Sequence, residues 1–186
     1  MIEISYNDEA VIVALGSNIR GDYASCELLL ETAISNLAYA GLRVTDRSEW
    51  WRSRAWPQSS SPDYLNGVVV VETLLDPRAL LAALLEIEVR FGRRRDRPNA
   101  PRTLDLDLIA YGRMLVDEPG LTIPHPRAAL RRFVMGPLAQ IAPTWRHPVS
   151  GQTALALAAT ASVGADAYPQ VVATRRKLDI GQSGEA

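Results

Sequence analysis

Two aspartates, separated by one leucine, are the clearest candidates for chemistry in this sequence. Asp105 and Asp107 lie in the stretch PRTLDLDLIAYG, residues 101–112. Alternation of polar and apolar residues is typical of a half-buried β-strand, so both carboxylates should point to the same face. Their Cα atoms would then lie roughly 6.6–7 Å apart, which allows both carboxylates to bind one cation. The alternative is an exposed strand face on which the acids have no special role.

An arginine-rich segment comes directly before the two aspartates. Residues 93–102 read RRRDRPNAPR, with Arg93 and Arg102 at the two ends. Paired carboxylates suit Mg²⁺, which prefers oxygen ligands and is often completed by the phosphates of a substrate. Arginines bind phosphate oxygens through paired hydrogen bonds. Together the two features predict a phosphoryl-transfer site that positions and neutralises its substrates. A solvated basic loop is the alternative.

The composition indicates a globular protein with one core and no disulfide. The chain has 186 residues, 47% of them apolar, and a single cysteine, Cys26. Its net charge of −1 gives no general attraction to nucleic acid or to anionic membranes. No apolar run approaches the ~20 residues of a membrane span, and the N-terminus lacks the features of a secretory signal. We therefore expect a monomeric cytoplasmic protein that binds neither nucleic acid nor membrane.

The order of the expected elements indicates the fold that must position these side chains. Apolar runs bounded by turn residues predict strands, and helical periodicity with capping signals predicts helices. We expect strands at 9–19, 42–51, 64–73 and 103–109, a helix at 23–39 capped by Asp22, and a helix at 77–91 after Asp76. The order β-α-β-β-α-β predicts an α+β protein of the ferredoxin-like type, an antiparallel sheet with helices packed on one face.

Further elements are expected after the strand that carries the two aspartates. A short excursion or hairpin is expected within residues 112–126, and C-terminal helical segments are expected at 127–142 and 152–162. Residues 1–160 then form one domain. Residues 161–186 form a C-terminal extension that we expect to be partly ordered.

Several segments, in this order, resemble the 6-hydroxymethyl-7,8-dihydropterin pyrophosphokinase family of folate biosynthesis. They are ALGSN at 14–18, PDYLN at 62–66, PRTLDLDLIAYG at 101–112, and LTIPHPR at 121–127 followed by RRFV and PLAQIAP. The resemblance extends from residue 10 to about residue 150 and implies the ferredoxin-like fold. It also implies a reaction in which pyrophosphate passes from ATP to the hydroxymethyl group of the pterin and AMP leaves.

The resemblance implies a role for each matching residue. Asp105 and Asp107 would bind two Mg²⁺ ions, and with Arg93 and Arg102 they form the expected catalytic set. The residues expected to contact ATP, the co-substrate, are Glu88, Arg93, Arg102, Leu108, Thr122, His125 and Arg131. The residues expected to contact the pterin are Ser53, Trp56, Tyr64, Asn66 and Phe133. An aromatic ring and an amide suit a flat heterocycle that needs stacking and a few fixed hydrogen bonds.

Two loops depart from the family pattern. The sequence RPNAPRT lacks the tryptophan that many members carry in RWGPRT, and RSRAWPQ replaces the more usual Thr-Pro-Pro-Leu-Gly. We expect loops 52–63 and 93–102 to fold over the substrates. The two departures affect this expected closure more than they affect the expected reaction.

Two other functions remain open from the sequence. One is an RNA-binding module, because ferredoxin-like folds include such modules, although the aromatic motif that stacks RNA bases is not seen. The other is a pterin- or nucleotide-binding module that has lost catalysis, against which the intact pair of aspartates argues.

Overall fold

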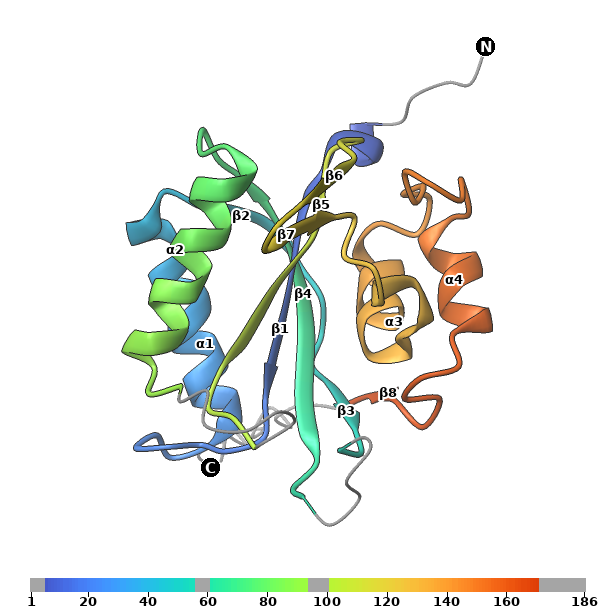
Figure 1. Cartoon of the computed structure of the whole chain (residues 1–186). Coiled ribbons are helices and arrows are strands. Elements are labelled where there is room, and N and C mark those ends of the chain that lie inside the picture. Colours follow the sequence, from blue (N-terminus) through green and yellow to red (C-terminus); the bar gives the residue numbers. More distant parts are fainter. Residues whose placement is uncertain (1–5, 56–60, 94–100, 171–186) are drawn as a thin grey trace, which may run out of the picture.

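One antiparallel β-sheet forms the centre of the molecule (Figure 1). The structure is a computed structural model that describes residues 6–55, 61–93 and 101–170. Within these ranges the sheet has six strands in the order β5-β1-β4-β3-β8, and β2 also pairs with β4. Their bounds are β1 Val11–Ser17, β2 Arg43–Arg47, β3 Trp51–Ser53, β4 Tyr64–Glu72, β5 Asp105–Tyr111 and β8 Tyr168–Pro169. The antiparallel sheet confirms the expected fold class.

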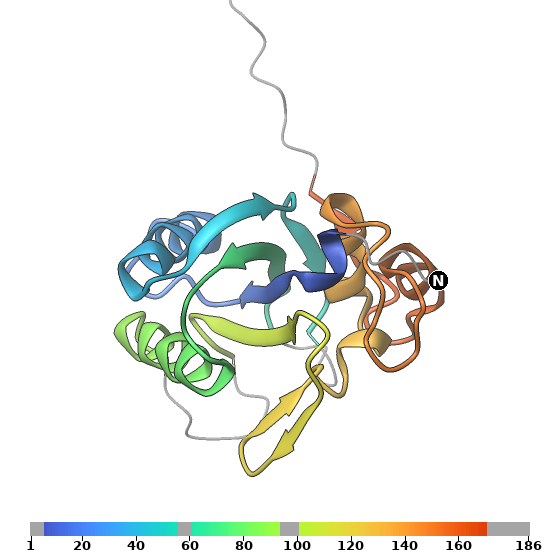
Figure 2. The same cartoon turned by 90° about the horizontal axis from the view of Figure 1, so that it is seen from above.

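Helices cover both faces of this sheet. Two helices, α1 (Cys26–Leu37) and α2 (Pro77–Arg90), lie on one face, as expected for the ferredoxin-like core. The C-terminal helices α3 (Arg132–Ile141) and α4 (Ala154–Thr160) lie on the opposite face, which the expectation of helices on one face did not include. Seen from above, the hairpin of β6 (Val116–Glu118) and β7 (Leu121–Ile123) projects beyond the sheet (Figure 2). Short 3₁₀ turns are η1 Tyr6–Glu9, η2 Ala38–Ala40 and η3 Ala128–Leu130.

The strand alternation divides the buried side chains into two layers. Leu104, Leu106 and Leu108 pack with α1 and α2 in the first layer, as the alternation predicts. Ile109 belongs to the second layer, with Leu138 of α3. Asp105 and Asp107 are only partly buried and share the face covered by α3 and α4. The same period-2 pattern therefore supplies the first core and exposes two carboxylates on the other side.

Two local expectations were wrong. Asp22 does not cap α1: the cap is Ser25, whose Oγ accepts a hydrogen bond from the Leu28 amide at 3.1 Å. The single strand expected at 42–51 is two strands, because Ser48 interrupts the ladder by accepting a hydrogen bond from the Val68 amide at 3.0 Å. Hydroxyl side chains commonly bond to nearby backbone groups in this way and end regular structure.

Residues 161–170 lie within the described part of the chain and return to the sheet. They follow α4 and end in β8, which pairs with β3. Among the described residues, no helix combines the length and the apolar character that crossing a bilayer requires.

Candidate active site

A cavity of about 270 Å³ opens between the sheet and the segment that leads into α3. Its floor comes from β1, and its walls come from β3, β4, β5 and residues 127–134. The lining residues are Ala14, Leu15, Gly16, Ser53, Arg54, Tyr64, Asn66, Arg102, Asp105, Asp107, Arg127, Leu130, Arg131, Phe133, Val134 and Val163. The cavity therefore brings together eight residues that the sequence predicted: Ser53, Tyr64, Asn66, Arg102, Asp105, Asp107, Arg131 and Phe133.

Small residues of β1 keep the floor of this cavity open. Gly16 pairs with Asp105 on one side and with Asn66 on the other, so these residues form one row across the sheet. A Cβ atom on Gly16 would lie 3.4 Å from Asn66 Oδ1 and 3.9 Å from Asp105 Cβ. In the next row Ala14 pairs with Asp107. The side of the cavity that carries Asp105 and Asp107 is thus joined to the amide side, which carries Asn66, across a floor with almost no side chains.

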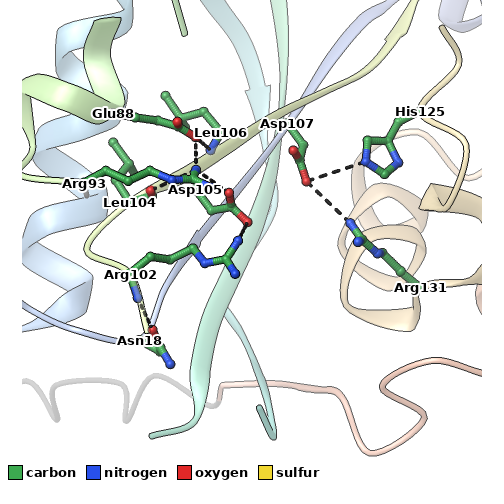
Figure 3. A network of polar contacts seen from close by, with 10 residues as sticks. All are labelled: Asn18, Glu88, Arg93, Arg102, Leu104, Asp105, Leu106, Asp107, His125 and Arg131. Carbon is green, nitrogen blue, oxygen red and sulfur yellow. Dashed lines mark hydrogen bonds and ion pairs between the residues drawn. The ribbon is translucent and has the colours of Figure 1, made fainter. Parts of the chain in front are cut away.

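Arginines surround Asp105 (Figure 3). Arg93 forms ion pairs with Asp105 and with Glu88, and it also donates a hydrogen bond to the Leu104 carbonyl at 3.3 Å. Arg102 Nη1 lies 3.1 Å from Asp105 Oδ2. Glu88 is almost fully buried and accepts a hydrogen bond from the Leu106 amide at 2.8 Å. Glu88 therefore fixes both the start of β5 and Arg93, so it acts behind the cavity rather than within it.

The position of Arg102 is set by its backbone. Its amide donates to Asn18 Oδ1 at 2.8 Å, and its carbonyl accepts a hydrogen bond from the Asn18 amide at 3.2 Å. The guanidinium lies 6.0 Å from the centre of the Tyr64 ring. Burial alone would lower the pKa of Arg102, but the charge of Asp105, its hydrogen bond to Arg102, and the charges of Tyr64 and Asp107 together outweigh burial and raise it. Arg102 therefore stays cationic in the cavity wall.

Nearby cationic groups neutralise the charge of the Asp107 carboxylate less closely than that of Asp105. Its Oδ2 lies 3.5 Å from Arg131 Nη1 and 3.9 Å from His125 Nε2. Burial raises the pKa of the Asp107 carboxyl, and the negative charge of Asp105 raises it further. Two neighbouring carboxylates that raise each other's pKa favour the binding of a cation between them.

His125 and Arg131 face this carboxylate from the other side. His125 Nδ1 accepts a hydrogen bond from the Arg127 amide at 3.2 Å, which leaves Nε2 toward Asp107. Burial lowers the pKa of the His125 imidazole and that of the Arg131 guanidinium, while the charge of Asp107 opposes both changes. Because Nδ1 already accepts a hydrogen bond, the proton of a neutral His125 belongs on Nε2.

The amide side of the cavity presents an aromatic ring and hydrogen-bonding groups. Asn66 Nδ2 donates to Ser53 Oγ at 3.1 Å, which orients the amide. The Phe133 ring lies on the opposite wall, with the Arg131 guanidinium 5.7 Å from its centre. Burial raises the pKa of the Tyr64 hydroxyl, so Tyr64 stays protonated at neutral pH. A flat polar heterocycle finds both stacking and hydrogen-bond partners here.

Five of the predicted residues that the structure describes do not line this cavity: Glu88, Arg93, Leu108, Thr122 and His125. The Leu108 side chain is buried in the first core layer, on the other side of the sheet. Thr122 is exposed on β7. Trp56 lies outside the described residues, as do residues 57–60 and 94–100 of the two loops that we expected to close.

Eight of the lining residues were not among the predicted site residues, and three of them, Arg54, Arg127 and Val163, bear on the chemistry or shape of the cavity. Arg54 directly follows Ser53, and Arg127 is the last residue of the LTIPHPR segment; their charge was the only signal that could have identified them. Val163 lies far beyond the motifs and joins the cavity only through the path of the chain after α4. With Arg54 and Arg127, the cavity wall carries four arginines beside its two aspartates. This combination of charged side chains is typical of enzymes that transfer phosphate groups.

Comparison with known proteins identifies the family. Residues 12–143 match the family described as 7,8-dihydro-6-hydroxymethylpterin-pyrophosphokinase. A 2-amino-4-hydroxy-6-hydroxymethyldihydropteridine pyrophosphokinase of Synechocystis is 48% identical over 149 residues, covering 78% of this chain and 73% of that protein. The enzyme of the same name from Pseudomonas aeruginosa is 37% identical over 161 residues, covering 87% of this chain and 98% of its own.

The chain therefore belongs to the 7,8-dihydro-6-hydroxymethylpterin-pyrophosphokinase family, and it transfers pyrophosphate to the pterin hydroxymethyl group in folate synthesis. Solved structures agree on the fold. The Plasmodium falciparum HPPK-DHPS protein aligns with a TM-score of 0.63 at 14% identity, covering 81% of this chain and 44% of that one. The resemblance drawn from the sequence is confirmed.

Proposed function

We propose that the cavity binds the pterin beside Phe133 and the ATP triphosphate beside the arginines, with Asp105 and Asp107 holding two Mg²⁺ ions where the two substrates meet. The observation that carries this proposal is the row formed by Asp105, Gly16 and Asn66. Gly16 leaves the floor open, so one substrate can extend from the amide side to the carboxylates without crossing a side chain.

The residues present fit magnesium. Asp105 and Asp107 offer carboxylate oxygens on one face, and the remaining positions around each ion are left for water and phosphate oxygens. The raised pKa of Asp107 supports this assignment, because burial and the charge of Asp105 together outweigh the opposing charges of His125 and Arg131. When bound, the ions would neutralise charge on the triphosphate and lower the pKa of the attacking hydroxyl.

The arginines would bind the triphosphate. Arg102 and Arg131 line the cavity next to the two aspartates, and Arg127 lies near Arg131 in sequence on the same wall. Arg93 already forms ion pairs with Asp105 and Glu88, so its main role would be to hold the Asp105 carboxylate in place. Guanidinium groups at fixed positions stabilise the charge on a transferring phosphoryl group without reorganising during the reaction.

The opposite wall would orient the pterin. Phe133 stacks on the ring, and Asn66, held by Ser53, offers an acceptor and a donor to the polar edge of the ring. The hydroxymethyl oxygen then forms a bond to the β-phosphorus of ATP while the bond from that phosphorus to the α-phosphate oxygen breaks. AMP leaves with this oxygen, and the hydroxyl proton passes to solvent.

A product assay tests the proposal directly. The purified protein is incubated with ATP, MgCl₂ and 6-hydroxymethyl-7,8-dihydropterin, and the nucleotide product is identified by chromatography. We expect AMP in equal amount to the pterin diphosphate, and no AMP when EDTA removes the metal. ADP as the product, or AMP formation that EDTA does not affect, contradicts the proposal. The cytoplasmic location and the monomeric state expected from the sequence stay predictions.

A further inference from the structure

Residues 161–170, which lie beyond the match of residues 12–143 to the family description, contact both walls of the cavity. The wall that carries Phe133 is bound first. The Val163 amide donates to the Leu130 carbonyl at 2.8 Å, and the Arg132 amide donates to the Val163 carbonyl at 2.9 Å. These two hydrogen bonds enclose Arg131 and tie it to Val163 in a short parallel bridge. Val163 itself lines the cavity.

Arg132 strengthens the same attachment. Its Nε donates to the Ala167 carbonyl at 3.2 Å, and its Nη1 donates to the Ala158 carbonyl at 3.1 Å. Ala167 is buried, although its neighbours in sequence are exposed. One guanidinium thus joins the start of α3, the end of α4 and the segment 161–170.

Gly164 lies against the Phe133 ring. A Cβ atom at this position would lie 2.5 Å from Phe133 Cδ1 and 3.1 Å from Cε1. Real Cβ atoms do not approach so closely, so any larger residue would move the ring. Gly164 also has a φ of 66°, which disfavours other residues. The ring that we assign to pterin stacking therefore lies directly against bare backbone at Gly164.

The opposite wall is bound by the next residues of the segment. Asp166 Oδ2 accepts a hydrogen bond from the Arg54 amide at 2.8 Å, at the point where the chain leaves β3. β8 then pairs with β3, and the Gln170 amide donates to the Trp50 carbonyl at 2.7 Å. Figure 1 shows the segment in red, running from α4 past α3 to β3. Ser53 and Arg54, which line the cavity, are therefore fixed from the same ten-residue piece of chain as Phe133.

We propose that residues 161–170 form a brace that sets the spacing between the Phe133 wall and the Ser53–Arg54 wall, with Gly164 and Asp166 as the positioning residues for the pterin. The inference rests on the proposed place of the pterin between these walls. Stacking and fixed hydrogen bonds on opposite sides of one ring demand a constant distance, and a small misplacement of either wall is costly in such sites. The brace acts mainly on pterin binding: it also ties the backbone of Arg131 to Val163, but Arg102, Asp105 and Asp107 are held by other contacts.

A matched pair of glycine variants tests the contact with Phe133. Gly164→Ala and Gly151→Ala both place alanine at a similar positive φ, 66° and 68°, but Gly151 has no atom within 4 Å of the added Cβ. Both variants should lower Tm through similar backbone strain, and Gly164→Ala should lower it further because the Phe133 ring must move. Only Gly164→Ala should raise the KM for the pterin, by about fivefold or more, with the KM for ATP unchanged. Equal pterin KM values in the two variants overturn the role of Gly164.

A second set tests the contact with Arg54 and does not depend on Gly164→Ala folding. Asp166→Ala removes the acceptor, whereas Asp166→Asn keeps an oxygen at the same position. Asp46→Ala is the control, because Asp46 is an exposed acid on β2 that does not line the cavity. We expect Asp166→Ala to raise the pterin KM by about two- to tenfold, as for one lost hydrogen bond. The pterin KM of Asp166→Asn and that of the control should stay near the value of the unmodified protein.

Asn66→Ala separates failure of the brace from failure of the proposed pocket. If this variant raises the pterin KM while the Asp166 and Gly164 variants do not, the brace is wrong and the pocket stands. If Asn66→Ala also leaves the pterin KM unchanged, the pterin does not bind between these walls and both proposals fall. An Asp166→Ala variant that raises the KM for ATP and for the pterin equally also overturns the brace, because a general loss of structure explains it.

Discussion

At the scale of single residues, Asp107 combines two conflicting demands. It lies beside Asp105 in a partly buried site, and burial and the neighbouring charge both raise its pKa. In the absence of a cation these effects destabilise the folded protein at neutral pH, because the ionised form is disfavoured there. With a divalent cation bound, the same carboxylates become its ligands.

Replacing either aspartate by asparagine should therefore reduce activity without reducing stability. Asp107→Asn should leave Tm unchanged or raise it in EDTA, because a repulsive charge is removed. The same variant, and Asp105→Asn, should lower kcat by about 100-fold or more, since metal stabilisation of the transition state contributes several kcal/mol. Circular dichroism confirms folding, and thermal denaturation with and without Mg²⁺ gives the two Tm values. Near-normal Mg²⁺-dependent turnover in both variants would show that these carboxylates are not the metal ligands.

His147 should make the stability of the protein depend on pH. Its Nδ1 accepts hydrogen bonds from the amides of Val149 and Ser150, both at 3.3 Å, and burial lowers the pKa of its imidazole. A lowered pKa means that the unfolded chain binds the proton more readily than the folded one. The contribution of His147 to the free energy of unfolding is thus complete above the pKa that the histidine has in the unfolded chain. It is lost as the pH falls through the lower pKa that the histidine has in the folded protein.

His147→Asn provides the measurement, because Asn Oδ1 can accept the same hydrogen bonds and does not titrate. Urea denaturation at several pH values between about 7.5 and 5 gives the free energy of unfolding of both proteins. We expect the unmodified protein to lose more free energy over this range than the variant does. Parallel curves for the two proteins would mean that protonation of His147 is not linked to folding.

At the scale of secondary-structure elements, β1 matters through the side chains that it lacks. Gly16 has an extended conformation that other residues can adopt, so its importance lies in space rather than in backbone strain. Gly16→Ala should fold normally and lose little activity, because the added Cβ meets Asn66 Oδ1 at an ordinary contact distance of 3.4 Å. Gly16→Val should fold but lose most of its kcat/KM, because its extra methyl groups occupy the floor between Asn66 and Asp105. Steady-state kinetics of the graded pair, with Tm as the folding control, checks this; equal activity in the two variants contradicts an open floor.

The elements also show how far sequence reasoning reached. Alternation around Asp105 and Asp107 predicted their shared face, because the period of a strand is a local property. The interruption by Ser48 was not predictable, since it depends on a hydrogen bond to β4, 20 positions away in sequence. The contact between Asp166 and Arg54 joins residues 112 positions apart and carries no local signal. Motif reasoning thus selected residues that line the cavity, but it did not identify long-range contacts such as the one between Asp166 and Arg54.

At the scale of the whole molecule, one sheet is shared by two hydrophobic layers. The layer under α1 and α2 contains Trp50, and the layer under α3 and α4 contains Trp145. Strands β1, β4 and β5 each contribute side chains to both layers, so loss of either helical pair exposes an apolar face of the same sheet. The two layers should consequently unfold together rather than as independent units.

Truncation in either layer tests this coupling. Leu84 of α2 and Leu138 of α3 are both fully buried, one in each layer. Leu84→Ala and Leu138→Ala should each lower the free energy of unfolding by about 2–5 kcal/mol. Variants in which Trp50 or Trp145 is the single remaining tryptophan, with the other three of the chain replaced by phenylalanine, then report each layer by fluorescence during urea denaturation. We expect the two probes to give the same midpoint in both truncation variants, because the shared sheet transmits the loss. A midpoint that shifts only for the probe in the truncated layer would show that the helical layers unfold separately.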